Sequence, residues 1–160
     1  MATPEFSFVV GNPANPERET RETIAFIRRI KQLNPAAEII VQHYIPTPHP
    51  DGMYGLNEGA IRFPETPDEW ATDRWYRYTT RVDPRLPWLP RHIKRRIDNF
   101  ELVIASRWPT MQDIHVPAWG RRLLSSLAAW RYSLEVYGMP LELEWAQKLV
   151  SLRKPRMESL

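Results

Sequence analysis

Cysteine is absent from the 160 residues, which excludes disulfides, thiolate metal sites and cysteine nucleophiles. Long apolar runs are also lacking, and no stretch approaches the roughly 20 residues that a helix needs to cross a bilayer. Residues 1–8 carry neither the basic nor the apolar region of a signal peptide. The sequence therefore predicts a cytoplasmic protein with no membrane span.

Nucleotide-binding fingerprints are missing as well. Gly11-Asn-Pro13 follows an apolar run, but it has no second glycine and no Lys-Ser/Thr. The net charge of +3 is small for a nucleic-acid-binding protein. The Trp/Arg-rich segment 70–96 could stack bases, but its aromatic spacing is helical and favours core packing. We therefore expect no nucleic-acid partner.

Metal and nucleophile signatures are also lacking. The chain has four histidines, and no pair has the spacing of metal ligands. There is no Gly-x-Ser-x-Gly elbow for a nucleophilic serine. We expect neither a metal site nor a catalytic residue in this chain. His43 ends a predicted strand, and it is either a satisfied polar residue or part of a site.

Sixteen prolines divide the chain into short elements. Residues 6–10 and 37–41 are apolar and β-branched, and they read as strands, the first of them buried on both faces. Between them, an Asn15-Pro16 start and an Asn34-Pro35 end enclose an amphipathic helix. This is one βαβ unit, with parallel strands and a right-handed crossover. Because two parallel strands cannot cover both of their faces, we expect the chain to belong to something larger.

The rest of the chain reads as helical. Thr66, Pro67 and Glu69 form a capping box, which starts a helix carrying Trp70 and Tyr78. Further helices are predicted over 91–108, 117–137 and 140–153. Residues 101–105 could form a strand, but their 3.6-residue period favours the helix. The predicted fold is α/β, with a βαβ domain over 1–55 and a helical region over 56–160.

Several short motifs occur in a recognisable order. They are Ser7-Phe-Val-Val-Gly11-Asn-Pro13, Glu19-Thr20, Ile45-Pro-Thr-Pro-His-Pro-Asp-Gly-Met-Tyr54, Glu58-Gly59, Phe63-Pro64, Asp68-Glu-Trp70, Trp130-Arg-Tyr132 and Tyr137-Gly-Met-Pro140. Together they resemble the late barrel strands and C-terminal region of radical SAM enzymes in the cobalamin-binding branch. The resemblance implies that residues 1–55 are part of a (β/α) barrel.

The same resemblance implies S-adenosylmethionine, a [4Fe–4S] cluster and cobalamin as cofactors. Val9 matches the apolar position that packs against the adenine, and Gly11 matches a glycine that lets the backbone approach it. The cofactor-binding positions implied are Val9, Gly11, Pro13, Ile45 and Pro46. The resemblance also implies a small-molecule substrate, with Gln42, His43 and Tyr44 as the substrate-binding positions.

The sequence also departs from the family pattern. Ser7 replaces the first glycine of the strand motif, and His49-Pro50 stands where Gly-Thr is usual. The cluster-binding cysteine motif is missing, and an iron–sulfur cluster needs thiolate ligands. The resemblance therefore implies that this chain is the C-terminal portion of an enzyme and is catalytically inactive by itself. The N-terminal half of that enzyme would carry the cluster and the cobalamin domain. The alternative is a free-standing, non-catalytic interaction module derived from that family, and either methyl transfer or ring formation remains open as the parent reaction.

Overall fold

The computed structural model describes residues 3–45, 62–79, 89–109 and 116–150. Predictions for Pro46, for His49-Pro50 and the rest of that loop, and for the end of the last helix lie outside these residues.

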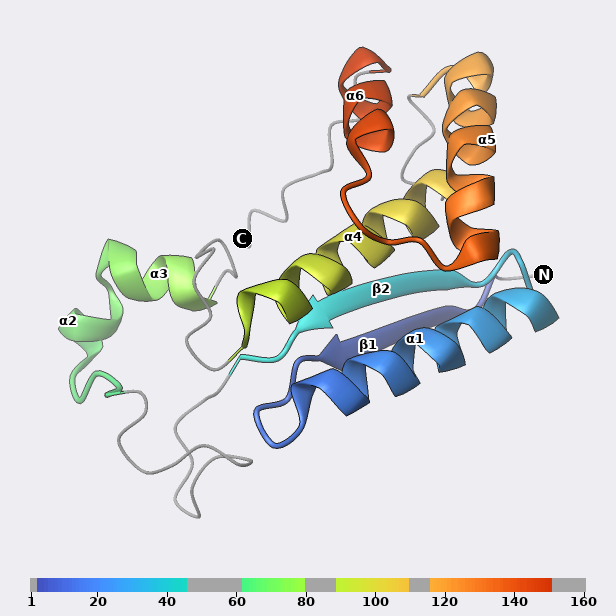
Figure 1. The fold of residues 1–160 in the computed structure, drawn as a ribbon. Coiled ribbons are helices and arrows are strands. Elements are labelled where there is room, and N and C mark those ends of the chain that lie inside the picture. The colour runs from blue at the N-terminus through green and yellow to red at the C-terminus, as the bar shows by residue number, and fades with distance from the viewer. Residues whose placement is uncertain (1–2, 46–61, 80–88, 110–115, 151–160) are drawn as a thin grey trace.

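The N-terminal third forms the predicted βαβ unit (Figure 1). Strands β1 (Glu5–Val10) and β2 (Glu38–His43) pair in parallel, with Val9 opposite Gln42 and Val10 opposite His43. Helix α1 (Pro16–Leu33) connects them. It begins where the Asn15 side chain accepts a hydrogen bond from the Arg18 amide, at 3.1 Å, as the Asn-Pro signal predicts.

The described helices cover one face of this sheet. Every second side chain along the strands lies on this face. Four of them belong to, or pack against, the hydrophobic clusters formed with α1 and with α4 (Arg91–Arg107), namely Phe8, Val10, Ile39 and Val41. The other face carries Ser7, Val9, Ile40 and Gln42, none of which joins a hydrophobic cluster of the described residues. The prediction that the first strand is buried on both faces is wrong, since Val9 is 52% exposed.

Two short helices follow where one was predicted. They are α2 (Pro67–Trp70) and α3 (Asp73–Thr79). The Thr66 hydroxyl accepts from the Glu69 amide at 3.4 Å, but the Glu69 carboxylate accepts from the Glu65 amide rather than from that of Thr66. Only half of the predicted capping box therefore forms.

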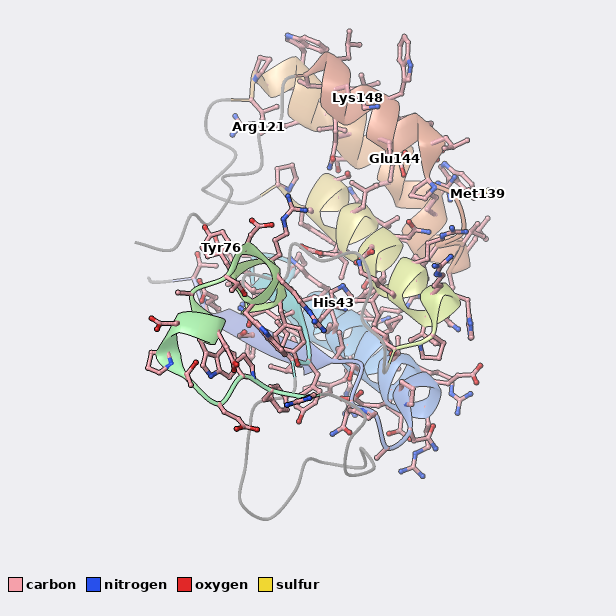
Figure 2. All side chains as sticks on the ribbon, turned by 90° about the vertical axis from the view of Figure 1, so that its left-hand side faces the viewer. His43, Tyr76, Arg121, Met139, Glu144 and Lys148 are labelled. Carbon is pink, nitrogen blue, oxygen red and sulfur yellow. The ribbon has the colours of Figure 1, made fainter. Side chains whose placement is uncertain are left out.

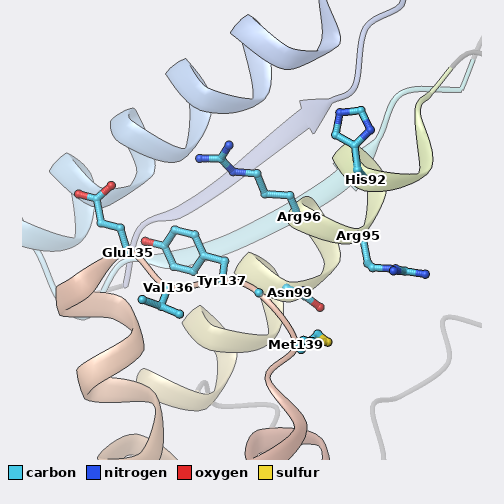
Figure 3. Close-up of a pocket in the computed structure, with 9 residues that line it drawn as sticks. His92, Arg95, Arg96, Asn99, Glu135, Val136, Tyr137 and Met139 are labelled. Carbon is cyan, nitrogen blue, oxygen red and sulfur yellow. The ribbon is translucent and has the colours of Figure 1, made fainter.

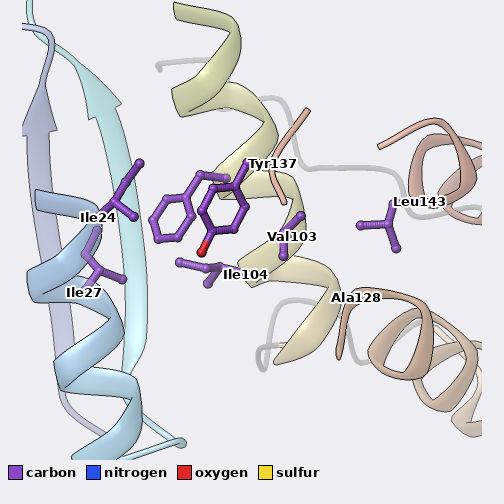
Figure 4. Close-up of a cluster of buried hydrophobic side chains, with 8 residues drawn as sticks. Ile24, Ile27, Val103, Ile104, Ala128, Tyr137 and Leu143 are labelled. Atoms are coloured by element: carbon purple, nitrogen blue, oxygen red, sulfur yellow. The ribbon is translucent and has the colours of Figure 1, made fainter. Parts of the chain in front are cut away.

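The C-terminal part is a helical hairpin packed on α4. It consists of α5 (Ala118–Leu134) and α6 (Leu141–Leu149), and residues 101–105 lie in α4, which confirms the helix reading. The main core joins α1 and α4 to the hairpin (Figure 4). At its centre Phe100 meets Tyr137 edge to face, with ring centroids 4.9 Å apart. No helix of the described residues is long and apolar enough to cross a membrane.

Candidate functional site

The turn after β1 is built around Gly11 and Glu19. The Glu19 carboxylate accepts hydrogen bonds from the amides of Gly11, at 3.0 Å, and Asn12, at 2.8 Å. Gly11 has a φ of +85°, and a Cβ there would lie 3.1 Å from the Leu89 side chain. The turn therefore requires glycine for its backbone and for the approach of Leu89. From sequence Glu19 entered as part of the Glu19-Thr20 motif, and nothing local indicated that its carboxylate closes this turn.

The predicted cofactor position Val9 and the predicted substrate position Gln42 lie side by side. They are opposite each other in the strand register, and alternation places both side chains on the uncovered sheet face. Tyr44 continues the pairing through its amide, which donates to the Val10 carbonyl at 2.7 Å, and Ile45 follows half-buried. Pro13 lies half-buried in the loop between β1 and α1. The carboxyl ends of both strands thus bring together most of the positions that the resemblance implies.

His43 belongs to the opposite face and pairs with α4. Its Nε2 lies 2.7 Å from Asp98 Oδ1, and the Lys94 ammonium donates to Asp98 Oδ2 at 2.8 Å. Burial would raise the pKa of Asp98, but the hydrogen bonds from His43 and Lys94 outweigh it and hold that pKa below its usual value. The Nδ1 of His43 is buried and has no hydrogen-bond partner among the described residues. The structure therefore separates His43 from Val9 and Gln42.

An aromatic cluster lies next to the carboxyl ends of the strands. Trp75 is buried and its ring centroid is 5.0 Å from that of Tyr78 and 5.1 Å from that of Trp70, with Phe63 against all three. Burial, with a smaller effect from Tyr44, raises the pKa of Tyr78 above its usual range. Figure 1 shows α2 and α3 on the side of the molecule toward which both strands point, and Figure 2 looks onto these strand ends from that side. Core packing, predicted for this segment, is confirmed for Trp75.

A hollow of about 470 Å³ lies between α4 and the loop that joins α5 to α6. Arg95 and Arg96 line it from α4, and Tyr137 and Met139 from the loop. Figure 3 shows the Arg96 side chain extending toward Glu135, whereas that of Arg95 points the other way. The two guanidinium groups therefore do not converge on one ligand position.

The described residues offer no set of side chains suited to a metal ion or an iron–sulfur cluster. Across the four described ranges, no three His, Asp or Glu side chains gather as a metal site. The sequence has no cysteine, so this chain supplies none of the thiolates that a [4Fe–4S] cluster requires. No protein-family model, curated protein or solved structure matches the chain.

The His43–Asp98 pair makes a testable contribution to stability. We expect Asp98→Ala to lower the free energy of unfolding by about 1 kcal/mol near neutral pH, because the His43 ring loses a hydrogen bond. Since the pKa of Asp98 is depressed in the folded state, its stabilisation is present above 3.8 and is lost as the pH falls below that value. Urea unfolding at pH 6 and pH 3 should show the difference between wild type and variant shrinking at pH 3. Asp73→Ala is the control, since Asp73 pairs with Arg77 on an exposed helix surface; an equal loss there would contradict the assignment.

Proposed function

We propose that this chain is the C-terminal portion of a radical SAM enzyme of the cobalamin-dependent branch, where it contributes to binding S-adenosylmethionine and substrate. The proposal rests on the ordered motifs of the sequence and on one structural observation. Among the described residues, helices cover one face of the sheet, and the apolar Val9 side chain lies on the other face.

One covered and one uncovered face is the arrangement of a barrel wall. In a (β/α) barrel the helices form the outer ring, and side chains of the opposite strand face fill the interior. In such a barrel Ser7, Val9, Ile40 and Gln42 would point inward. The binding site of a barrel lies at the carboxyl ends of the strands, where Val9, Gln42, Tyr44 and Ile45 are found.

The side chains at this position suit an adenosyl group. Val9 offers an exposed apolar surface for the adenine ring, and the Gln42 amide beside it offers both donors and an acceptor. The amides of Gly11 and Asn12 are already bound by Glu19, so they hold the turn rather than the ligand. Bound S-adenosylmethionine would supply an activated sulfonium; the cluster that cleaves it must come from outside this chain, because the chain has no thiolates.

Two measurements test the proposal. The first is the DNA sequence upstream of the start codon, where we expect a reading frame with a Cys-x-x-x-Cys-x-x-Cys motif preceded by a cobalamin domain. The second is a binding affinity for S-adenosylhomocysteine, measured by calorimetry on a protein that contains both the upstream half and this chain. We expect Val9→Asp to weaken it at least tenfold, because a carboxylate would replace the apolar contact, a cost of about 1.4 kcal/mol or more.

The control for this binding experiment is Leu33→Asp. Leu33 is 80% exposed at the end of α1, away from the strand ends, so the affinity should stay unchanged. If no such reading frame lies upstream and the chain does not bind S-adenosylhomocysteine, the proposal fails and the alternative of a non-catalytic interaction module is favoured.

A further inference from the structure

Helices α5 and α6 expose seven large apolar side chains. Those on α5 are Trp119, Leu123, Trp130 and Leu134, and those on α6 are Leu141, Trp145 and Leu149. Trp145 is 72% exposed and Leu134 69%. We call these seven residues the hairpin face. Single exposed apolar residues are ordinary, but a contiguous group of this size indicates an interaction surface.

Spacing places each set on one stripe of its helix. At 100° per residue, the four positions on α5 fall within about 60° of arc. The three positions on α6 follow each other at intervals of four, within about 80°. Each stripe therefore presents its side chains in one direction.

Contacts between α5 and α6 place the two stripes along the same seam. Arg131 of α5 pairs with Glu142 of α6, and its guanidinium carbon lies 4.7 Å above the Trp130 ring. On the side away from the stripes, Ser125 of α5 bonds to Arg107 of α4, and Gln147 of α6 bonds to Ser106 of α4. The hairpin face is thus the outer surface of the α5–α6 hairpin, turned away from α4.

This surface is separate from the uncovered sheet face. Helix α4 lies between the hairpin and the strands (Figure 1), and it packs on both. A partner that completes the sheet would leave the hairpin face exposed.

The hairpin face has the area of a dimer interface. From their exposed fractions, the three tryptophans and four leucines present roughly 800 Å² per chain, which equals one side of a standard interface. Its border carries charges of both signs, namely Arg122, Glu144 and Lys148. An apolar centre with a mixed polar rim is typical of protein–protein interfaces, whereas helices that bind membrane surfaces carry a mainly basic polar face.

We propose that the hairpin face is an isologous interface with a second copy of this chain. Two helical hairpins that meet through their apolar faces form a four-helix bundle, with the tryptophans and leucines of both copies in its core. The inference is independent of the proposed enzymatic function, because it concerns a different surface.

Sedimentation equilibrium of the full chain tests the interface. We expect a mass twice the 18.9 kDa of one chain, and at least a tenfold weaker association for Trp145→Asp, which places a charge in the apolar centre. Leu33→Asp, at a still more exposed position on α1, should leave the dimer unchanged. A monomer at all concentrations would overturn the inference, as would a dimer that Trp145→Asp leaves intact.

Cross-linking distinguishes this interface from association through the sheet. Because the chain has no cysteine, Ser126→Cys introduces one thiol at the border of the hairpin face, and Ala25→Cys one on exposed α1. We expect oxidation to yield covalent dimers at position 126 and not at position 25. Equal yields at both positions, or none at 126, would overturn the inference, as would binding to lipid vesicles with loss of the dimer.

Discussion

Replacing Arg131 with alanine is expected to lower the free energy of unfolding by about 3 kcal/mol, because it removes a buried guanidinium and leaves three backbone carbonyls and the half-exposed Glu142 carboxylate without their donor. Arg131 is only 6% exposed, and all five of its N–H groups are used. Two donate to the Glu142 carboxylate, and three donate to the carbonyls of Val136, Gly138 and Met139. One side chain therefore holds α5, the following loop and α6 together.

Urea unfolding followed by circular dichroism measures this loss. Arg131→Lys keeps the charge but not the planar fork of donors, so we expect it to recover less than half of the lost stability. The matched control is Arg18→Ala, which removes an exposed pair with Glu22 on α1 and should cost less than about 0.5 kcal/mol. Similar losses for Arg131→Ala and Arg18→Ala would show that the buried network does not stabilise the hairpin.

Local signals were enough to predict the elements. Asn15-Pro16 and Asn34-Pro35 bracket α1 because a side-chain cap and proline act on the neighbouring backbone alone. The 3.6-residue period correctly placed residues 101–105 in α4, whose buried positions include Phe100 and Ile104. The origin of the βαβ unit in a larger barrel stays a prediction.

Long-range contacts were beyond the sequence. Alternation along β1 showed that Val9 and Val10 face opposite ways, but not which face α4 would cover. For the same reason His43 was grouped with Gln42, although its partner Asp98 lies 55 positions away. The single helix predicted around Trp70 and Trp75 breaks at Ala71-Thr72, where the Thr72 hydroxyl donates to the Glu69 carbonyl at 2.9 Å.

Deprotonation of Lys31 is expected to stabilise the protein, whereas the Arg131 substitution destabilises it. Its ammonium is buried against Trp108, 4.8 Å from the ring centroid, and donates to the carbonyls of Pro35 and Ala37 at 3.1 and 2.6 Å. Burial lowers the pKa of Lys31 from 10.5 to about 8, although the nearby Glu38 opposes the shift. A neutral amine retains two N–H donors, which is enough for both carbonyls. Deprotonation therefore removes a buried charge without breaking either hydrogen bond.

The free energy of unfolding is therefore expected to rise by about 2 kcal/mol between pH 7.5 and 9.5. In this window the unfolded state keeps the Lys31 proton while the folded state has lost it, so stability increases with pH. Urea titrations at the two pH values measure the rise, and Lys31→Met should abolish it while exposed Lys148→Met keeps it. The upper limit of 9.5 matters because burial also raises the pKa of Tyr132 and Tyr137, and their ionisation in the unfolded state lowers stability at higher pH. A flat or falling profile in the wild type would contradict the buried position of the Lys31 ammonium.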